Sequence, residues 1–335
     1  MYDEIFDAVH ESKEWLDGYY THFQALRDIE SYIQTISKEN LRVKCFQNDE
    51  FQVENNIFET FFLILTKKII KNQDIIGFFA VIFECIRRIC NSIDENIDLE
   101  SKKSIEITDF TDGILLNSIT SLLFYENIIL NCAHDYYYEG LIVKEECDKT
   151  SNAIFAALKK FLTAQNDEEI FDGNNYPSVN ECINKHHVNR SSGFFHSFLI
   201  VLHQTGQASD KDVENYYPIF KNFGICFSML DDILDFKEDI ACSNYNLLIS
   251  LILKNEDYDF YELKNNYNSM DPHIMVLYQK YADIVYQMAD SYFFKARSMV
   301  MRKIPETNEG ELDIIQQYYI KILEKIQNIT DFSFR

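Results

Sequence analysis

The amino-acid sequence predicts an all-α protein, and three observations support that fold class. Proline and glycine are scarce, at 4 and 9 of 335 residues, so the chain has few helix breakers and few tight turns. Apolar residues recur at helical spacing over most of the chain, and no stretch alternates between apolar and polar residues as a half-buried strand would. Apolar residues make up 47% of the chain, which is ample for a sizeable core. We therefore expect one large helical bundle.

The N-terminal segment is expected to pack on that bundle. Residues 1–40 are amphipathic, with Trp15 and Tyr19 four positions apart on one face, which is typical of a helix. A polar and irregular stretch follows at 41–54. We therefore interpret 1–54 as an N-terminal helix followed by an irregular segment.

Most of the remaining chain shows helical periodicity. The clearest loop is 166–180, which contains Asp-Gly-Asn-Asn and a proline. Because the polar segments are too short to be domain linkers, residues 1–335 are expected to form a single domain. Helical patterns fill roughly 55–72, 75–94, 112–140, 150–165, 180–205, 210–238 and much of 244–330, with breaks near Pro272 and Pro305.

The chain is strongly acidic, with a formal net charge of −23 at pH 7. Such a charge repels nucleic-acid backbones and anionic membranes, which excludes a general nucleic-acid-binding role. An acidic protein that binds a phosphorylated ligand must hold it through metal ions or through a few local cations.

The cysteines and the hydropathy pattern indicate a cytoplasmic protein. None of the 8 cysteines forms a C-x-x-C pair, as expected of buried, reduced thiols. The acidic start MYDEIFDAVHESKEW lacks the apolar core of a signal peptide. No uninterrupted apolar run reaches membrane-spanning length, so we expect no membrane span.

An aspartate-rich segment, MLDDILDF, is the strongest candidate for a functional site. On a helix, Asp231 and Asp235 share one face, and two carboxylates there repel each other unless a cation lies between them. Apolar flanks such as Phe227 and Leu230 place the carboxylates in a core or cleft, which disfavours the alternative of a solvated acidic face. Mg²⁺ prefers such oxygen ligands, so we expect Asp231, Asp232 and Asp235 to bind it.

The segment resembles the second aspartate-rich motif of trans-isoprenyl diphosphate synthases and of the terpene synthases that share their fold. That motif reads G-x-x-F-Q-x-x-D-D-x-x-D, and this chain has Gly224, Phe227 and then Ser228 in place of the glutamine. A Lys-Thr pair lies upstream in the family, and NRSSGFFHSFLIVLHQTGQAS puts Arg190 and Ser191 at those positions. The resemblance implies an isoprenoid-synthase-type bundle with a central active-site cavity, in which Arg190 and Ser191 bind a diphosphate.

The family also has a first acidic motif, H-D-D-x-x-D followed by two arginines. The best match here starts at His134, so that Asp135 takes the first aspartate position, Tyr136 replaces the second and Glu139 takes the last. The first arginine position falls at Lys144 and the second at a glutamate. By resemblance, Asp135 and Glu139 bind metal, Lys144 binds the diphosphate, and the two motifs together hold three Mg²⁺ ions. A solvated acidic pair is the alternative for this degenerate motif.

The cationic residues that bind isopentenyl diphosphate in the family are mostly missing. The family's Gly-Lys-x-x-Arg-Pro stretch has no match in ENLRVKCFQND, where only Arg42 and Lys44 could be remnants. Asn244 falls where a later lysine is expected. Acidic metal-site positions therefore remain, whereas cationic acceptor-site positions are lost.

This pattern favours Mg²⁺-dependent ionisation of an allylic prenyl diphosphate by a terpene synthase (a cyclase) derived from an isoprenyl diphosphate synthase. Asp231, Asp235 and Asp135 are the expected catalytic residues. One alternative is a prenyltransferase that condenses the allylic diphosphate with isopentenyl diphosphate or another acceptor. A second alternative, from another class, is a catalytically silent regulatory subunit of a heteromeric prenyl synthase. A third is a helical scaffold with a chance DDxxD string. A homodimer is one expected assembly.

Overall fold

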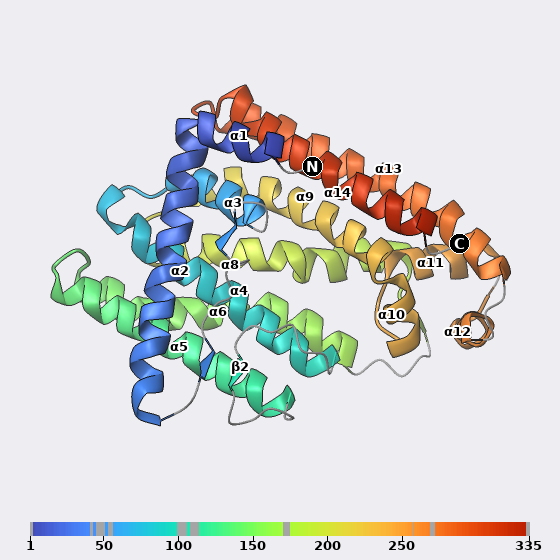
Figure 1. Cartoon of the computed structure of the whole chain (residues 1–335), viewed down its shortest axis with the longest axis horizontal. Coiled ribbons are helices and arrows are strands. Elements are labelled where there is room, and N and C mark those ends of the chain that lie inside the picture. The colour runs from blue at the N-terminus through green and yellow to red at the C-terminus, as the bar shows by residue number, and fades with distance from the viewer. Residues whose placement is uncertain are drawn as a thin grey trace. The chain divides into compact units, whose positions relative to one another are not determined.

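The described residues of the chain are almost entirely helical. The computed structural model describes residues 3–40, 43–44, 51–52, 56–98, 106–107, 114–169, 175–256, 258–268 and 272–332. The all-α class is confirmed (Figure 1). The exception is a minimal antiparallel pairing of β1 (Val43–Lys44) with β2 (Glu106–Ile107), which the sequence did not predict.

The helices range from short turns to a helix of 32 residues. In chain order they are α1 (Asp3–Glu11), α2 (Lys13–Asn40), α3 (Ile57–Lys67), the 3₁₀ turn η3 (Gln73–Ile75), α4 (Ile76–Asp98), α5 (Ile114–Tyr138), α6 (Lys144–Glu169), α7 (Val179–Glu181), the π-helix η5 (Cys182–His187), α8 (Ser191–Gln204), α9 (Asp210–Leu234), α10 (Phe236–Cys242), α11 (Leu247–Glu256), α12 (Phe260–Asn268), α13 (Pro272–Lys303) and α14 (Glu309–Phe332).

The predicted helices are present with shifted ends. The pattern at 1–40 forms two helices, because the chain breaks at Ser12 between α1 and α2. The pattern at 150–165 belongs to the longer α6. The pattern at 210–238 ends early, at Leu234, and resumes as α10.

The chain divides into two compact units, which we describe separately. Unit 1 contains Met1–Leu158, Ser197–Glu214 and Pro305–Tyr318, and unit 2 contains Lys159–His196, Asn215–Ile304 and Tyr319–Arg335. The expectation of a single domain over residues 1–335 stays a prediction.

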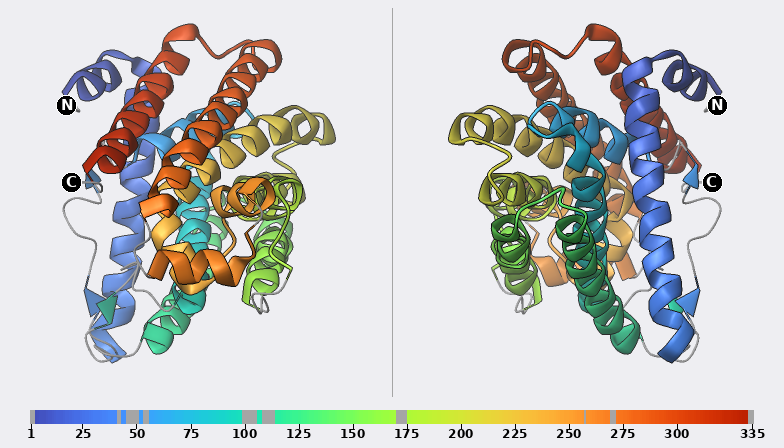
Figure 2. Two further views of the ribbon diagram at one scale, coloured as in Figure 1. Left: turned by 90° about the vertical axis from the view of Figure 1, so that its right-hand side faces the viewer. Right: turned by 90° about the vertical axis from the view of Figure 1, so that its left-hand side faces the viewer.

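The core of unit 1 is built on α2, α4 and α5. These three helices lie side by side, as Figures 1 and 2 both show. Phe83 of α4 packs edge-on against Phe198, with ring centroids 4.9 Å apart. Trp15 is fully buried, and its indole N–H donates to the carbonyl oxygen of Glu311 at 3.1 Å. Aromatic packing therefore joins segments of unit 1 that lie far apart in the sequence.

Unit 1 also contains a buried cluster of charged side chains. The Glu84 carboxylate accepts hydrogen bonds from Arg87 Nη2 at 2.6 Å and from Arg88 Nε at 2.7 Å. His22 Nε2 lies 3.3 Å from the same carboxylate. Burial alone would raise the pKa of Glu84, but the two guanidinium charges hold it well below its ordinary value. This cluster gives Arg87 and Arg88, which match no motif of the family, a structural role.

The core of unit 2 surrounds α9 and α13. Phe223 packs edge-on against Phe293, and Phe293 stacks on Tyr319 with ring centroids 4.1 Å apart. The Tyr319 hydroxyl donates to Asp290 Oδ1 at 2.6 Å, which satisfies the polar end of this buried ring. The packing fixes α9, which carries the aspartate-rich segment, within unit 2.

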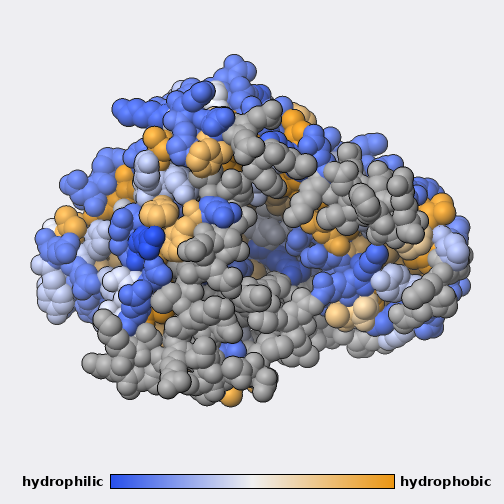
Figure 3. Space-filling model, in the orientation of Figure 1, coloured by the Kyte–Doolittle hydropathy of each residue, from blue (hydrophilic) through white to orange (hydrophobic). Residues whose placement is uncertain are grey.

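The described surface mixes polar and apolar residues. Figure 3 shows hydrophilic residues over much of one face, with hydrophobic residues interspersed. On α5, four apolar side chains on neighbouring turns are exposed: Leu115, Leu116, Ile119 and Leu123.

Candidate active site

The aspartate-rich segment lies at the junction of α9 and α10. Helix α9 ends at Leu234, and Asp235 has backbone angles of φ −92° and ψ 4° before α10 begins. The Asp235 N–H still donates to the Asp231 carbonyl at 2.8 Å, so the two residues keep their one-turn spacing. Asp231 is exposed and Asp235 is half-buried. Both side chains are therefore at least partly accessible to a ligand at the surface of unit 2.

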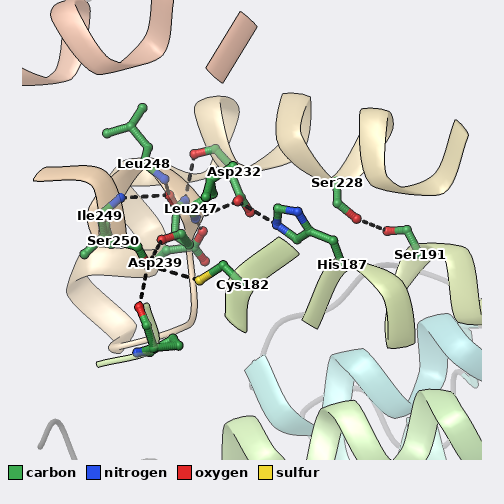
Figure 4. A network of polar contacts seen from close by, with 12 residues as sticks. Cys182, His187, Ser191, Ser228, Asp232, Asp239, Leu247, Leu248, Ile249 and Ser250 are labelled. Atoms are coloured by element: carbon green, nitrogen blue, oxygen red, sulfur yellow. Dashed lines mark hydrogen bonds and ion pairs between the residues drawn. The ribbon is translucent and has the colours of Figure 1, made fainter. Parts of the chain in front are cut away.

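Asp232 has a different environment from its two neighbours in the motif. It is 8% exposed, and its Oδ2 accepts hydrogen bonds from His187 Nε2 at 2.9 Å and from the Leu247 N–H at 2.7 Å (Figure 4). Leu247 is the first residue of α11, where a carboxylate interacts favourably with the exposed N–H groups and the helix dipole. Asp232 thus connects α9 with η5 and α11, which the sequence did not predict.

Asn246 completes this junction. Its Oδ1 accepts from the Leu248 N–H at 2.8 Å, as a helix N-cap side chain does. Its Nδ2 donates to the Asp232 carbonyl and to Asp239 Oδ2, both at 2.7 Å. Burial, followed by the nearby charge of Asp232, raises the pKa of the Asp239 carboxyl well above its usual range. The junction is a buried polar network in which side chains of α9, α10 and the α11 cap satisfy one another.

The predicted diphosphate residues Arg190 and Ser191 lie beside this motif. Ser228 Oγ donates to Ser191 Oγ at 2.5 Å, so the residue at the glutamine position contacts the residue at the threonine position. Arg190 is the turn residue directly before α8, and its charge acts on Asp239. A small pocket of unit 2 brings these groups together: it is lined by His186, His187, Arg190, Ser191, Ser228, Asp231, Asp232 and Tyr245.

Gly224 explains how α8 and α9 approach so closely. A Cβ added at this position would lie 2.6 Å from both the N and the Cα atoms of Ser192. Since the obstacle is backbone, it cannot be relieved by rotating a side chain. The glycine of the motif thus allows the approach that places Ser191 against Ser228.

Sequence reasoning missed three residues of this pocket. His186 and His187 end the π-helix η5, a form of helix that is often found at functional sites. The His186 ring packs edge-on against Tyr245, with centroids 4.1 Å apart. The His-His pair directly before the Arg190 region was visible in the sequence, but nothing in its spacing related it to the aspartates.

The degenerate first motif lies at the end of α5, in unit 1. Asp135 and Glu139 are exposed and one turn apart, and the Glu139 N–H donates to the Asp135 carbonyl at 2.9 Å. The Tyr32 hydroxyl donates to Asp135 Oδ2 at 2.5 Å, a contact that the sequence did not predict. Lys144 is exposed at the first position of α6. The predicted residues of this motif are therefore accessible to a ligand.

Tyr136, which replaces the second aspartate of the first motif, packs inside unit 1. Its ring lies 5.1 Å from that of Phe78, and a Cβ added at Gly77 would be 2.9 Å from its hydroxyl oxygen. Tyr136 therefore packs against α4, at the position where the first motif of the family has its second aspartate.

The metal-ligand predictions stay predictions. In the part of the chain that the structure describes, no three His, Cys, Asp or Glu side chains gather closely enough to hold a metal ion. The donor chemistry of Asp231 and Asp235 nevertheless fits Mg²⁺, which proteins commonly hold through one or two carboxylates together with substrate phosphates.

Comparisons with known proteins identify the fold. No protein-family profile matches the chain, and no curated protein sequence matches it. Solved structures do match it. A geranylgeranyl pyrophosphate synthase from Lactobacillus brevis superposes with a TM-score of 0.67 at 14% identity, covering 93% of this chain and 97% of that one. The geranylgeranyl pyrophosphate synthetase of Pyrococcus horikoshii gives 0.62 at 15% identity, covering 92% and 99%.

A third match has been solved with ligands. The geranylgeranyl pyrophosphate synthase of Corynebacterium glutamicum, complexed with isoprenyl diphosphate and magnesium, superposes with a TM-score of 0.60 at 12% identity, covering 91% of this chain and 98% of that one. The chain thus has the fold of the trans-isoprenyl diphosphate synthases, and the predicted fold type is confirmed. None of the described helices combines the length and apolar character needed to cross a membrane.

Proposed function

We propose that this protein is a Mg²⁺-dependent enzyme that ionises an allylic prenyl diphosphate, and that it acts as a terpene synthase. The observation that carries the proposal is the pocket in which Arg190 and Ser191 meet Ser228 and Asp231. By resemblance to the isoprenyl diphosphate synthases, Arg190 and Ser191 fall at the Lys-Thr positions, and Ser228 and Asp231 fall within the second aspartate-rich motif. The fold matches support a prenyl diphosphate as the substrate class.

The roles of the residues follow from their chemistry. The Arg190 guanidinium would pair with diphosphate oxygens, and its planar fork suits two parallel hydrogen bonds. The hydroxyls of Ser191 and Ser228 would orient the same group. Asp231, Asp232 and Asp235 would hold Mg²⁺, and Oδ2 of Asp232 also accepts hydrogen bonds from His187 and from the Leu247 N–H. When bound, Mg²⁺ supplies positive charge that stabilises the departing diphosphate.

The first motif would supply further ligands. Asp135 and Glu139 are proposed for additional ions and Lys144 for the diphosphate, and the count of three ions rests on the resemblance. Asp231, Asp235 and Asp135 are accordingly the proposed catalytic carboxylates.

The loss of acceptor-site cations favours a terpene synthase over chain elongation. Asn244 takes the place of the expected lysine, and its side chain donates to Asp239 at 3.3 Å, so this position serves the α10–α11 junction. Arg42 and the side chain of Lys44 lie outside the described residues. With fewer cations for a second diphosphate, a reaction of one substrate alone is the better fit.

The test is incubation with geranyl, farnesyl or geranylgeranyl diphosphate, each alone with Mg²⁺, followed by measurement of released diphosphate and by product analysis. We expect release from at least one substrate, and its loss in Asp231→Asn. The control is Asp283→Asn, which changes an exposed aspartate of α13 that does not line the pocket. Equal activity of both variants would remove Asp231 from the site.

Chain elongation is the second candidate, because the matching solved structures include geranylgeranyl and octaprenyl pyrophosphate synthases. Diphosphate release only after isopentenyl diphosphate is added would establish it in place of the terpene synthase. A silent subunit would show neither reaction, and its thermal unfolding midpoint would not rise with Mg²⁺ and diphosphate.

A further inference from the structure

A groove on unit 1 has no part in the proposed function. It lies between α6, the end of α8 and the start of α9, and its volume is about 530 Å³. Pockets that bind small molecules commonly measure about 300–1,000 Å³. All the residues that line the groove belong to unit 1, and none of them belongs to either acidic motif or to the pocket beside Arg190. The groove is therefore a candidate for a second binding site.

The more buried residues of the groove are apolar. Ala156 of α6, Ile200 of α8 and Val213 of α9 are half-buried, and we call these three residues the floor. The polar residues that line the groove are exposed, and they form its rim: His203, Gln204, Asp210 and Glu214. Hydrocarbon placed against the floor would be removed from water together with it, so the floor favours a ligand that contains methylene groups.

The helices around the groove are joined to one another. Ser197 Oγ donates to the Ala157 carbonyl oxygen at 2.6 Å, which connects α8 with α6. Gln207 Nε2 donates to Glu146 Oε1 at 3.1 Å, which connects the turn between α8 and α9 with α6. A ligand would therefore meet a largely preformed surface, and preformed sites lose less conformational entropy on binding.

The rim carries negative charge. Asp210 and Glu214 lie one turn apart at the start of α9, and no lysine or arginine is among the described residues that line the groove. His203 Nε2 lies 2.8 Å from Asp210 Oδ1, but both side chains of this pair are exposed, and pairs of this kind are weak. A cation can therefore compete for Asp210. The net charge of −23 also attracts cations to the chain as a whole.

Helix stabilisation explains only part of this charge. A carboxylate in the first turn of a helix interacts favourably with the helix dipole, which accounts for Asp210. The cap of α9 is formed by other residues: Ser209 Oγ accepts from the Asp212 N–H at 3.3 Å, and Asp212 Oδ2 accepts from the Ser209 N–H at 2.8 Å. Glu214 lies beyond the first turn, where the effect of the dipole has faded. Its carboxylate therefore adds negative charge to the groove without serving the cap.

We propose that this groove binds an aliphatic polyamine. Ammonium groups of the ligand pair with Asp210 and Glu214, and the methylene chain between the ammonium groups covers the floor. The amide oxygen of Gln204 accepts a further hydrogen bond from an ammonium group. This inference goes beyond the proposed function and does not depend on it.

Other classes of ligand fit the groove less well. A divalent metal ion would neutralise the carboxylates but would leave the apolar floor in water. A prenyl diphosphate or an anionic lipid would cover the floor but would bring negative charge to an acidic rim. An organic cation with a hydrocarbon chain matches both the floor and the rim.

The first experiment titrates the full chain with spermidine by isothermal calorimetry at about 0.15 M salt, where charges more than about 8 Å apart are largely screened. We expect saturable binding of one spermidine per chain. Combining Asp210→Asn with Glu214→Gln removes two exposed ion pairs with the ligand and should weaken binding about tenfold. The matched control combines Asp283→Asn with Glu324→Gln, which removes the same charge from exposed residues outside the groove and should leave binding unchanged.

Three results of this titration would overturn the proposal. The first is the absence of saturable binding. The second is equal weakening in the groove variant and in the matched control, which would show a general attraction of cations to an acidic chain. The third is loss of binding in Asp231→Asn, which would place spermidine at the aspartate-rich segment.

The second experiment tests the space rather than the charge. Ala156→Trp fills the groove and leaves its charge unchanged, so it should abolish spermidine binding, and unchanged binding would contradict the location. If this variant does not fold, as judged by circular dichroism, Gln204→Lys replaces it, because a positive charge at this exposed position should repel the ligand. Mg²⁺ is the competing ligand at constant ionic strength. Displacement of spermidine by an equimolar amount of Mg²⁺ would show a simple cation site and overturn the proposal.

Discussion

At the scale of single residues, the buried charged cluster of unit 1 makes Glu84 sensitive to substitution. Removing one partner from a buried ion pair typically costs about 3–5 kcal/mol, because the remaining charge loses its compensation. We therefore expect Glu84→Gln to lower the free energy of unfolding by about 3–5 kcal/mol. Urea denaturation measures the change. The control is Glu30→Gln, which breaks the more exposed pair with Arg27 and should cost about 0–1 kcal/mol. Equal effects would contradict the buried-cluster interpretation.

The carboxylate of Glu84 should also make the free energy of unfolding depend on pH. The pKa of Glu84 is lowered in the folded protein, so the folded state binds its proton less tightly than the unfolded state does. Its contribution is present above the unfolded pKa of about 4.3 and is lost as the pH falls towards the folded pKa. The stability difference between the wild-type protein and Glu84→Gln should thus shrink when urea denaturation is repeated from pH 6 down to pH 3. A stability difference that stays constant over this pH range would show that protonation of Glu84 does not affect the free energy of unfolding.

Gly224 and Gly18 allow a matched test of close packing. An added Cβ would meet an atom at 2.6 Å in both cases, but the obstacle at Gly224 is the Ser192 backbone, whereas at Gly18 it is a side-chain carbon of Ile64. A side chain can shift more readily than the backbone of a packed helix, so Gly224→Ala should destabilise the protein more, by about 1–3 kcal/mol. It should also weaken diphosphate binding, because Ser191 would move away from Ser228. Calorimetry and a binding titration check both parts.

At the scale of elements, the sequence predicted which segments are helical better than where they end. Apolar periodicity continues through Asp235 into α10, so the break in the motif leaves no trace in the pattern. The π-helix η5 is equally invisible, since one wider turn changes no residue type. The grouping of Arg190 and Ser191 with Asp231 was predicted by resemblance. Asp232 and His187 could not be paired, because their contact depends on that wider turn and on the start of α11.

The end of α5 provides a test of the first motif. We expect Asp135→Ala to abolish turnover in the diphosphate-release assay, as a metal-ligand role requires. Tyr32→Phe removes the hydroxyl that donates to Asp135 while keeping the ring, so it should raise the Mg²⁺ concentration needed for half-maximal activity and leave the fold intact. The comparison variant is Asp283→Asn, an exposed residue of α13 outside both motifs, which should keep the activity of the wild-type protein. Full activity of Asp135→Ala would remove the first motif from the site.

At the scale of the whole molecule, the exposed apolar side chains of α5 predict self-association. Leu115, Leu116, Ile119 and Leu123 are exposed on neighbouring turns, and contiguous apolar surface on a protein commonly marks an interface. We expect a homodimer, with a mass twice the 39.6 kDa of the chain in light scattering. Leu123→Glu should shift the protein to the monomer. The control is Val276→Glu, an exposed apolar residue of α13, and a monomeric wild-type protein would contradict the prediction.

The buried position of Asp232 predicts which aspartate of the motif is retained in related proteins that have lost activity. Its carboxylate holds η5 against the start of α11, so selection for folding alone would retain it. Asp231, by contrast, is exposed, and substitutions at exposed positions usually change stability little. In descendants that have lost activity, the first aspartate of the pair should therefore mutate while the second survives. A related chain that keeps the second aspartate but lacks the first would therefore indicate descent from an active enzyme, because folding requires only the second.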